Sequence, residues 1–524
     1  MKNVLCMLLA VVMVFSLVAC SGGKTAPTDT GGNVISPDDS TPGKPTPTAP
    51  TVLRVSRGED VTTWDPYNNT GIVLIMLGKL IYNNLIQMDP QGNFLPDLAT
   101  EWSANDDATE WTFKLREGVS FSDGTAFNAE AVKISLERYL NETLSNGNLW
   151  SSFIGVDVVD ETTCVLKFST PNGSLPNTLT ETPMLNPTTI KEKGADGLID
   201  AIGTGPYMLE SWDIGSKIVL KKNPSYWGDP PSFETIEYYV IQEDSTRLAA
   251  VQTGDIDIAD QIPADLVATI GANDPVQIKR INGQDNMFLG LKCDTPPFDD
   301  VNARLAVLYG INRQSLVDNV VLGGQTVRGI MPEGTMGYSE DFPEIKYDPE
   351  YAKGLLAKTS YNGEELEFIA PIGWYVKQSE QCQAIIADLK EVGFNIKLTM
   401  LEGATFSSTR NNGIYSIYTT GCAHPASDPN LFLSQRVKGD SAKSGYVNEE
   451  LNAKIDEAAS NADPIKRQEL YEQVVQVMLD NAAPMIPLFQ WERIYAVSDK
   501  IDLDASADTF RSDLRMDLRF VVFK

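Results

Sequence analysis

The chain has 524 residues, of which 42% are apolar and 22% charged, and its formal net charge is −29. This length and composition predict about three folding units or one large two-lobed globular protein, which excludes a small disulfide-bonded domain and disorder throughout. The negative charge would be repelled by phosphate backbones, so no nucleic acid partner is expected. His424 is the only histidine, which excludes multi-histidine metal cages, and no metal or cofactor is expected.

The N-terminus predicts export. Lys2 precedes the apolar stretch 4–19, as in a signal peptide, and the stretch ends in Leu-Val-Ala-Cys, which resembles the bacterial lipobox. Residues 1–19 are therefore interpreted as a lipoprotein signal peptide and Cys20 as the lipidated residue. Residues 20–50 are rich in Gly, Ser, Thr and Pro and predict a disordered tether. We expect a body anchored by lipid to the extracytoplasmic face of the cell membrane.

The remaining cysteines are Cys164, Cys293, Cys382 and Cys422, and none forms a CxxC motif. This spacing excludes a zinc ribbon and a thioredoxin-type site. The thiols are expected to be small buried residues, and if one disulfide exists, Cys382 with Cys422 closes the shortest loop.

The first half of the chain is rich in strand patterns with helices between them. Asn128 is expected to cap a helix that extends through Leu140. Alternating apolar residues predict strands at 53–56, 111–115, 163–168, 217–220 and 236–241.

The pattern becomes helical from residue 296. Val301, Leu305 and Leu308 are expected on one buried helix face. A helix over 376–392 is followed by a strand over 395–400, which implies a helix-to-strand crossover. Asp463-Pro464 opens a last long helix, which buries Leu470, Val474 and Met478. The predicted class is α/β or mixed α+β in two lobes.

Several ordered segments between residues 53 and 500 resemble the family 5 extracellular solute-binding proteins, the peptide and nickel receptors of ABC importers. The matching segments are 95–102, 113–119, 121–125, 129–138, 203–207, 222–227, 254–257, 296–301, 311–313 and 347–349. Residues 203–205 (Gly-Thr-Gly) are interpreted as scaffold, since Pro206 lacks the amide hydrogen that a phosphate-binding loop needs.

The resemblance implies a two-lobed periplasmic-binding-protein-like fold, mixed α/β, with an extra subdomain in the first lobe. Lobe I would comprise 51–283 and 489–524, with the subdomain inserted at about 89–200, and lobe II would comprise 284–488. The implied function is that of a monomeric substrate-binding lipoprotein, not an enzyme. It would capture short peptides or peptide-like solutes and deliver them to an ABC permease with its ATPase subunits.

Three alternatives remain open at this point, one of which is a surface adhesin or signalling receptor built on the same fold. The same fold could bind a non-peptide solute, either an oligosaccharide or a metal chelate. A secreted hydrolase that uses a pair of carboxylates is the alternative from another class, because the chain is rich in Asp and Glu.

The resemblance also suggests ligand contacts. Peptide receptors of the family hold the ligand's ammonium with the acid of a motif like G-x-x-A-D-x-x-D-P, and residues 421–429 here read Gly-Cys-Ala-His-Pro-Ala-Ser-Asp-Pro. His424 therefore stands in place of the acid. Asp428 either reaches the ligand or caps the following helix at Leu431. The other candidate contacts are the rings Trp374 and Tyr375, the pair Thr63 and Trp64, and Asn286 with Phe288 near the predicted lobe crossover.

Overall fold

The computed structural model describes residues 51–68, 71–89, 92–145, 147–423, 427–439, 444–510 and 516–524, all within the unit Ala49–Lys524. The predicted signal peptide, Cys20 and the tether lie outside the described residues, and so does His424.

Strands and helices alternate along both halves of the chain, as the sequence predicts. The strands are β1 (Val52–Arg57), β2 (Ile86–Met88), β3 (Phe94–Pro96), β4 (Ala99–Ala104), β5 (Glu110–Leu115), β6 (Phe153–Asp160), β7 (Thr163–Phe168), β8 (Tyr207–Asp213), β9 (Lys217–Lys222), β10 (Thr235–Val240), β11 (Ile258–Ala259), β12 (Val276–Leu291), β13 (Gln325–Thr326), β14 (Glu365–Pro371), β15 (Asn395–Leu401), β16 (Ile417–Ala423) and β17 (Met485–Ser498). The helices are α1 (Ile72–Ile81), α2 (Ala129–Leu136), α3 (Arg138–Asn141), α4 (Leu175–Leu179), α5 (Pro187–Lys193), α6 (Asp244–Thr253), α7 (Ala264–Val267), α8 (Val301–Gly310), α9 (Arg313–Ser315), α10 (Pro349–Leu356), α11 (Gln378–Val392), α12 (Gly403–Asn411), α13 (Asn430–Arg436), α14 (Glu449–Ser460) and α15 (Pro464–Asp480).

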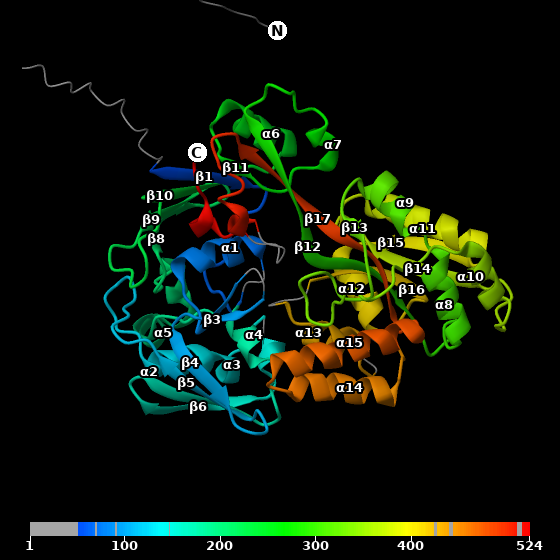
Figure 1. Cartoon of the computed structure of the whole chain (residues 1–524), viewed down its shortest axis with the longest axis horizontal. Coiled ribbons are helices and arrows are strands. Elements are labelled where there is room, and N and C mark those ends of the chain that lie inside the picture. Colours follow the sequence, from blue (N-terminus) through cyan, green and yellow to red (C-terminus); the bar gives the residue numbers. More distant parts are fainter. Residues whose placement is uncertain are drawn as a thin grey trace, which may run out of the picture. The chain divides into compact units, whose positions relative to one another are not determined.

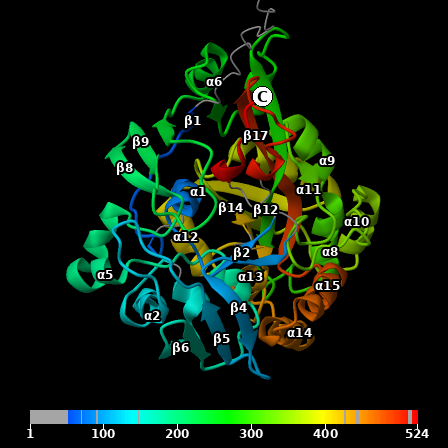
Figure 2. The same cartoon turned by 60° about the vertical axis from the view of Figure 1, so that its left-hand side comes forward.

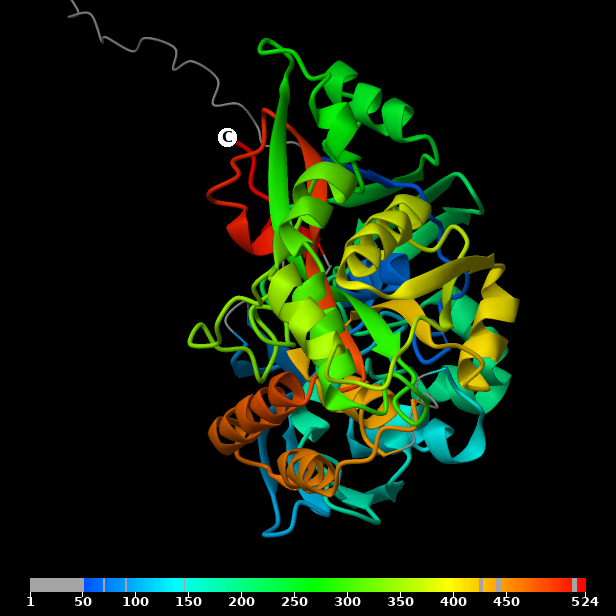
Figure 3. The ribbon, with the colours of Figure 1, turned by 90° about the vertical axis from the view of Figure 1, so that its right-hand side faces the viewer.

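One large mixed sheet joins the two halves. Its strand order is β15-β14-β16-β12-β17-β11-β1-β10-β9-β8, with β13 paired to β17. The two long strands β12 and β17 are antiparallel neighbours from Val276↔Ser498 to Gly290↔Met485, so they carry the chain twice between the halves. Figure 1 and Figure 3 show this pair as the long ribbon that links the elements around β1 with those around β14.

A second sheet, β4-β5-β7-β6, is built from the segment inserted between α1 and β8. Helix α2 packs against β6 and β7, and Figure 2 shows α2 beside this sheet. Helix α11 follows β14 and precedes β15 along the chain, and these two strands are parallel neighbours. This is the helix-to-strand crossover that the sequence predicts for residues 376–400.

The apolar cores follow the same division of the described chain. One core gathers residues from β1, α1, β8–β10 and the C-terminal segment, and a second lies under the inserted sheet. The largest core contains residues between Met287 and Phe489. The first and the largest core cover different parts of the one large sheet, and the second covers the inserted sheet, so apolar burial stabilises each region locally.

Residue chemistry explains the helix boundaries. The Asn128 side chain accepts a hydrogen bond from the Ala131 amide at 3.1 Å and begins α2, although the predicted helix is interrupted at Glu137 and continues as α3. Asp463 caps α15 through the amide of Ile465 at 2.9 Å, and Leu470, Val474 and Met478 are buried as expected.

The buried face of α8 agrees with the prediction only in part. Leu308 is buried as predicted, and so are Ala303 and Val307, whereas Val301 and Leu305 are only half-buried. The reason is tertiary packing, because α8 lies against both α10 and α11 and needs small residues where the helices meet. A Cβ atom on Gly310 would lie 2.8 Å from the Val392 side chain of α11.

The Gly-Thr-Gly segment and the thiols have scaffold roles. A Cβ on Gly203 would lie 2.0 Å from the carbonyl oxygen of Ile81, so this loop packs directly on the end of α1. The four described cysteines are free thiols, and Cys164, Cys293 and Cys382 are buried.

Candidate functional site

A cavity of about 1010 Å³ is lined by residues of lobe I, lobe II and the two long strands that connect them. Its walls carry aromatic rings from all three parts. These rings are Tyr82, Tyr139 and Trp150 in lobe I, Trp374 and Tyr375 in lobe II, and Trp491 on β17. Ligand sites in proteins typically combine such apolar walls with a few polar groups.

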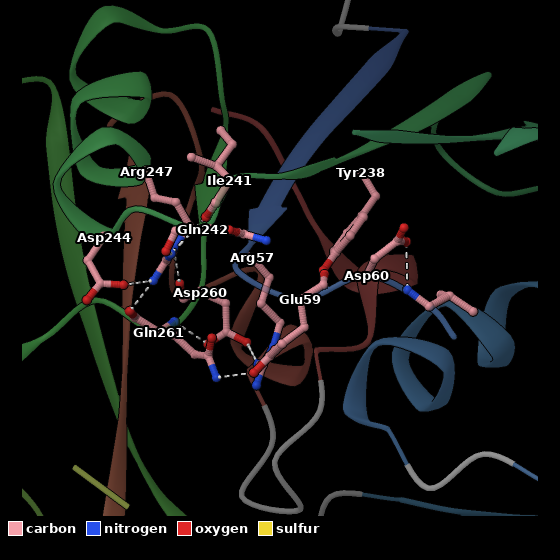
Figure 4. A network of polar contacts seen from close by, with 11 residues as sticks. Arg57, Glu59, Asp60, Tyr238, Ile241, Gln242, Asp244, Arg247, Asp260 and Gln261 are labelled. Carbon is pink, nitrogen blue, oxygen red and sulfur yellow. Dashed lines mark hydrogen bonds and ion pairs between the residues drawn. The ribbon is translucent and has the colours of Figure 1, made fainter. Parts of the chain in front are cut away.

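The wall in lobe I is formed where parallel strands end. Because β1 is parallel to β10 and β11, Arg57 at the end of β1 lies beside Asp260, which follows β11. The Arg57 guanidinium donates to the buried Asp260 carboxylate and to Glu59, as Figure 4 shows. Burial alone would lower the pKa of Arg57, but Asp260 and Glu59 outweigh it and raise this pKa. Asp260 lines the cavity with its charge already neutralised.

A second buried arginine holds the adjoining loops together. Arg247 donates to the carbonyl oxygens of Ile241 and Gln242 at 2.8 and 2.9 Å and to that of Gln261 at 2.7 Å (Figure 4). Its Nη2 also donates to Asp244 at 2.5 Å. The polar network of this wall is therefore satisfied by the protein itself, which fits a rigid scaffold.

The wall formed by the connecting strands has a different character, because β12 contains a bulge. Asn282 pairs with Glu492 and Asn286 with Gln490, so three residues of β12 lie opposite Trp491 of β17. The Gln490 side chain donates to the Gly283 carbonyl oxygen at 2.6 Å and fixes the bulge. Bulges redirect side chains, and here Asp285 of the bulge lines the cavity.

Asp285 and Arg493 bring opposite charges to this wall without pairing. The Asp285 Oδ1 and the Arg493 Nε are buried, and neither has a hydrogen-bond partner among the described residues. Burial raises the pKa of the Asp285 carboxyl, and the positive charge of Arg493 opposes that rise. Buried polar atoms without partners are uncommon in folded proteins and need an explanation.

The aromatic part of the site is built on the loop before α11. The Tyr375 ring stacks on Trp491, with centroids 6.4 Å apart, and its hydroxyl oxygen accepts a hydrogen bond from the Gly421 amide at 2.7 Å. The Trp374 ring packs edge-on against Phe406 and is 46% exposed. The structure thus places Trp374 and Tyr375 in the cavity wall.

Asp428 lies elsewhere. Its carboxylate accepts from the buried Arg467 and from the Asn430 amide, the latter at 2.8 Å, so it neutralises a buried cation and supports the start of α13. It lines a separate small cavity of about 30 Å³, not the large one. The helix-capping alternative is thus the one that matches its contacts, although they begin one residue before Leu431.

The remaining expected contacts are also outside the cavity wall. Trp64 is 1% exposed and packs edge-on against Trp212, while the Thr63 hydroxyl accepts from the Asp65 amide at 3.1 Å. Phe288 is buried and stacks on Phe432. Asn286 is buried too, and its amide donates to the Ile330 carbonyl at 3.0 Å. None of these four residues, nor Asp428, is among the residues that line the large cavity.

Sequence reasoning missed Asp285, Arg493 and Trp491. Asn286 came within one residue of Asp285, and successive strand residues point to opposite faces, so one position separates the cavity from the core. No sequence signal identifies the bulge, because it depends on pairing with a strand some 200 residues away along the chain.

Two further searches concern metals and membranes. The described residues contain no group of three or more His, Cys, Asp and Glu residues placed to hold a metal ion. No helix in the described part of the chain combines the length and the apolar character needed to cross a membrane.

Comparisons with known proteins agree with this architecture. The sequence pattern of the bacterial extracellular solute-binding proteins, family 5, matches residues 93–444. The chain is 29% identical over 431 residues to the probable D,D-dipeptide-binding periplasmic protein DdpA of Escherichia coli (strain K12), covering 78% of this chain and 82% of that one. It is 27% identical over 456 residues to the glutathione-binding protein GsiB of Salmonella typhi, covering 83% and 88%.

The fold agrees as well. The structure of NikA from Brucella suis in complex with Fe(III)-EDTA superposes with a TM-score of 0.80 at 22% identity, over 90% of this chain and all of that chain. The two-lobed architecture of the periplasmic solute-binding proteins is therefore present here. With a family pattern that spans more than half of the sequence, the chain belongs to the family 5 bacterial extracellular solute-binding proteins.

Proposed function

We propose that this protein is the substrate-binding lipoprotein of an ABC importer. It captures a short peptide or peptide-like solute between its lobes and delivers it to a membrane permease with ATPase subunits. Membership of family 5 supports the binding role, and the names of DdpA and GsiB, a dipeptide-binding and a glutathione-binding protein, support the ligand class.

The large cavity is the observation that carries this proposal. Its volume of about 1010 Å³ lies at the upper end of the roughly 300–1,000 Å³ of small-molecule sites. The rings offer apolar surface, while Asp285 and Arg493 offer opposite charges, each with a buried polar atom that has no hydrogen-bond partner among the described residues. A peptide presents both kinds of surface, which a neutral oligosaccharide does not.

We also propose that the lobes close about β12 and β17, with the boundaries at 283/284 and 488/489. Two strands crossing between lobes act as a hinge when few other connections restrain them. We expect the radius of gyration from small-angle X-ray scattering to decrease when ligand is added. An equal radius with and without a ligand shown to bind would count against closure.

The ligand class is tested by recovery of bound solute. The purified protein is denatured, and the released small molecules are identified by mass spectrometry and then tested for binding by calorimetry. Peptides or peptide-like solutes with dissociation constants in the micromolar range or tighter are expected. Recovery of only sugars or metal chelates would replace the peptide proposal by one of the alternatives, and turnover of an added peptide or glycoside would contradict a purely binding role.

The lipid anchor is a separate proposal that depends on Cys20. Cys20→Ala should release the protein from the membrane fraction while leaving ligand affinity unchanged, because the tether carries no part of the cavity. Tight membrane retention of this variant would show that another segment holds the protein at the membrane.

His424 remains a proposed ligand contact, because Gly421 and Cys422 of β16 line the cavity a few residues before it. A neutral imidazole would accept a hydrogen bond but supply no full charge. His424→Ala should weaken binding about 5- to 150-fold if the imidazole makes a buried hydrogen bond to the ligand. An unchanged affinity would make His424 a bystander.

A further inference from the structure

The bulge in β12 and the neighbouring part of β17 form a charged wall within the cavity. Asp285 lies in the bulge, while Trp491 and Arg493, two positions apart on β17, both line the cavity. The bulge is held from β17 and β13, since Gln490 of β17 donates to Gly283 and Gln325 of β13 donates to Gln490 at 2.7 Å. The two charges therefore stand on well-supported backbone at the strands that connect the lobes.

Three carboxylates on this wall and the adjoining lobe I wall already have a cationic partner. Glu492 binds Arg280 at 2.6 Å, and Asp260 binds Arg57. Glu59, another carboxylate close to Arg493, binds Arg57 and accepts a hydrogen bond from Gln261 at 3.2 Å. Asp285 and Arg493 form no ion pair, either with each other or with any other described residue, and each leaves a buried polar atom without a partner.

We propose that Asp285 and Arg493 are the specificity-determining groups for a zwitterionic solute, with Asp285 receiving its ammonium group and Arg493 its carboxylate. This inference rests on the proposed binding function and narrows its ligand class. An ammonium group can donate to the unpartnered Asp285 oxygen, and the guanidinium can donate two parallel hydrogen bonds to a carboxylate.

The chemistry favours a ligand that carries both charges. A ligand with only an ammonium group would leave the Arg493 Nε without an acceptor, and a purely anionic ligand would leave the Asp285 oxygen without a donor. Each omission leaves a desolvated polar group unsatisfied in the complex, so single-charge analogues bind more weakly. The stacked rings of Trp491 and Tyr375, which line the same cavity, would contact the apolar body of the solute.

The test compares defined solute pools on the full-length protein and its variants. The first pool contains synthetic di- and tripeptides with free termini, and two further pools contain the same peptides N-acetylated or C-amidated. A fourth pool contains free amino acids and betaines, and a fifth contains neutral oligosaccharides. Retained solutes are separated by gel filtration, released by denaturation and quantified by mass spectrometry.

We expect the wild type to retain peptides with free termini about 10- to 100-fold better than either blocked form, the scale of one charged hydrogen bond. Asp285→Asn should remove the preference for a free amine but keep the preference for a free carboxylate. Arg493→Gln should do the reverse. Arg493→Lys should restore part of the carboxylate preference, because it restores charge without the two-pronged geometry.

Two control variants have matched changes in charge at exposed positions outside the cavity. Glu380→Gln in α11 is compared with Asp285→Asn, and Lys358→Gln after α10 with Arg493→Gln. Both controls should keep the wild-type preferences. Thermal unfolding is recorded for every variant, and if Asp285→Asn fails to fold, Asp285→Ser takes its place.

The outcomes separate this inference from the proposed function. The inference is overturned, and peptide binding is left in place, if the wild type retains blocked peptides as well as peptides with free termini. The same holds if folded Asp285 and Arg493 variants prefer free termini as strongly as the wild type does. Retention of only amino acids, with loss of charge selectivity in the variants, supports the inference and overturns peptide binding. Retention of only betaines overturns both, because a trimethylammonium group has no N–H to donate to Asp285. Retention of only oligosaccharides, or of nothing by the folded wild type, overturns both.

Discussion

Two regions of the cavity wall use the same chemistry in opposite ways. At the strand ends of lobe I, Arg57 and Asp260 are buried and bound to each other. At the bulge between β12 and β17, the charge of Arg493 opposes the rise in the pKa of the buried Asp285 carboxyl, but the two side chains form no ion pair. In the first region the aspartate and the arginine bind each other. In the second region each keeps a buried polar atom that no described residue binds.

The difference teaches how to separate scaffold charges from ligand-binding charges. A buried ion pair that is fully satisfied contributes little net stability, yet removing one partner is costly because it leaves the other charge uncompensated. An unpaired buried charge reduces stability in the unliganded protein, and binding sites tolerate that cost because the ligand removes it. Substitutions in the two regions should therefore have opposite effects on stability.

The largest effect is expected at the paired region. Asp260→Ala leaves the Arg57 guanidinium buried with only Glu59 as a charged partner, and should reduce the free energy of unfolding by about 3–5 kcal/mol. Urea titration followed by tryptophan fluorescence measures this change. The double variant Arg57→Met with Asp260→Leu removes both charges and should recover most of the loss. A single variant within about 1 kcal/mol of wild type would show that this pair does not hold the wall together.

The opposite sign is expected at the bulge. Asp285→Asn removes an ionised carboxylate that lacks a partner and should raise the free energy of unfolding of the unliganded protein at pH 8 by about 1 kcal/mol. Because the folded pKa of Asp285 is raised above its unfolded value, the stability penalty of the wild type is complete above the folded pKa and absent below the unfolded one. The gap between variant and wild type should narrow as pH falls through the folded pKa and vanish below the unfolded value. A destabilised variant at pH 8 would contradict an unsatisfied carboxylate.

The sequence predicts the first region better than the second, for physical reasons. Alternating apolar residues identify β1 and β10, and parallel strands end at a common edge, so the polar residues after them are natural candidates. Yet even there Arg57 and Asp260 are 203 residues apart, and only the pairing of β1 with β11 brings them together. The local sequence pattern therefore predicts the secondary-structure elements. Which charged side chains lie side by side depends on the register between strands that are distant in the sequence.

The bulge region is invisible to local pattern. Residues 282–286 read Asn-Gly-Gln-Asp-Asn, which indicates a turn more than a strand, although they lie inside the 16-residue β12. Caps such as Asn128 and Asp463 were predictable because their effect is local. The bulge could not be predicted in this way, because it arises from a mismatch in residue number between β12 and its distant partner strand β17.

A smaller effect is expected from two tryptophans that both entered the sequence-based site. Trp374 is 46% exposed at the cavity, whereas Trp64 is 1% exposed in a core. Trp374→Ala should therefore lower affinity for a bound peptide by about 0.5–1.5 kcal/mol, or roughly 2- to 12-fold, with little change in stability. Calorimetry with the peptide recovered from the wild type measures this loss. Ile372→Ala, an exposed change in the same loop but outside the cavity, is the control, and equal affinities for both variants would remove Trp374 from the site.

The smallest effect is expected where the lobes touch away from the connecting strands. Arg467 of α15 binds Asp428 within lobe II, and its Nη1 also donates to the Asn177 side chain of α4 in lobe I at 3.0 Å. The Gly173 amide donates to the Ala459 carbonyl at 2.9 Å nearby, so the lobes meet closely at this point. The Asp428 contact holds inside one lobe, whereas the Asn177 contact exists only while the lobes are together.

Asn177→Ala removes the side-chain hydrogen bond to Arg467 between the lobes, and leaves both the Gly173–Ala459 hydrogen bond and the ion pair in lobe II intact. Opening then becomes easier by about 0.5–1 kcal/mol, the net value of one hydrogen bond, and the apparent affinity should fall about 2- to 5-fold through loss of the binding-competent population. Scattering should show a larger average radius for the unliganded variant but the same radius once ligand saturates it, since the ligand then supplies the closing energy. A variant that loses affinity with no change in unliganded radius would place Asn177 in ligand binding instead, and one that loses neither would show that closure is governed by β12 and β17 alone.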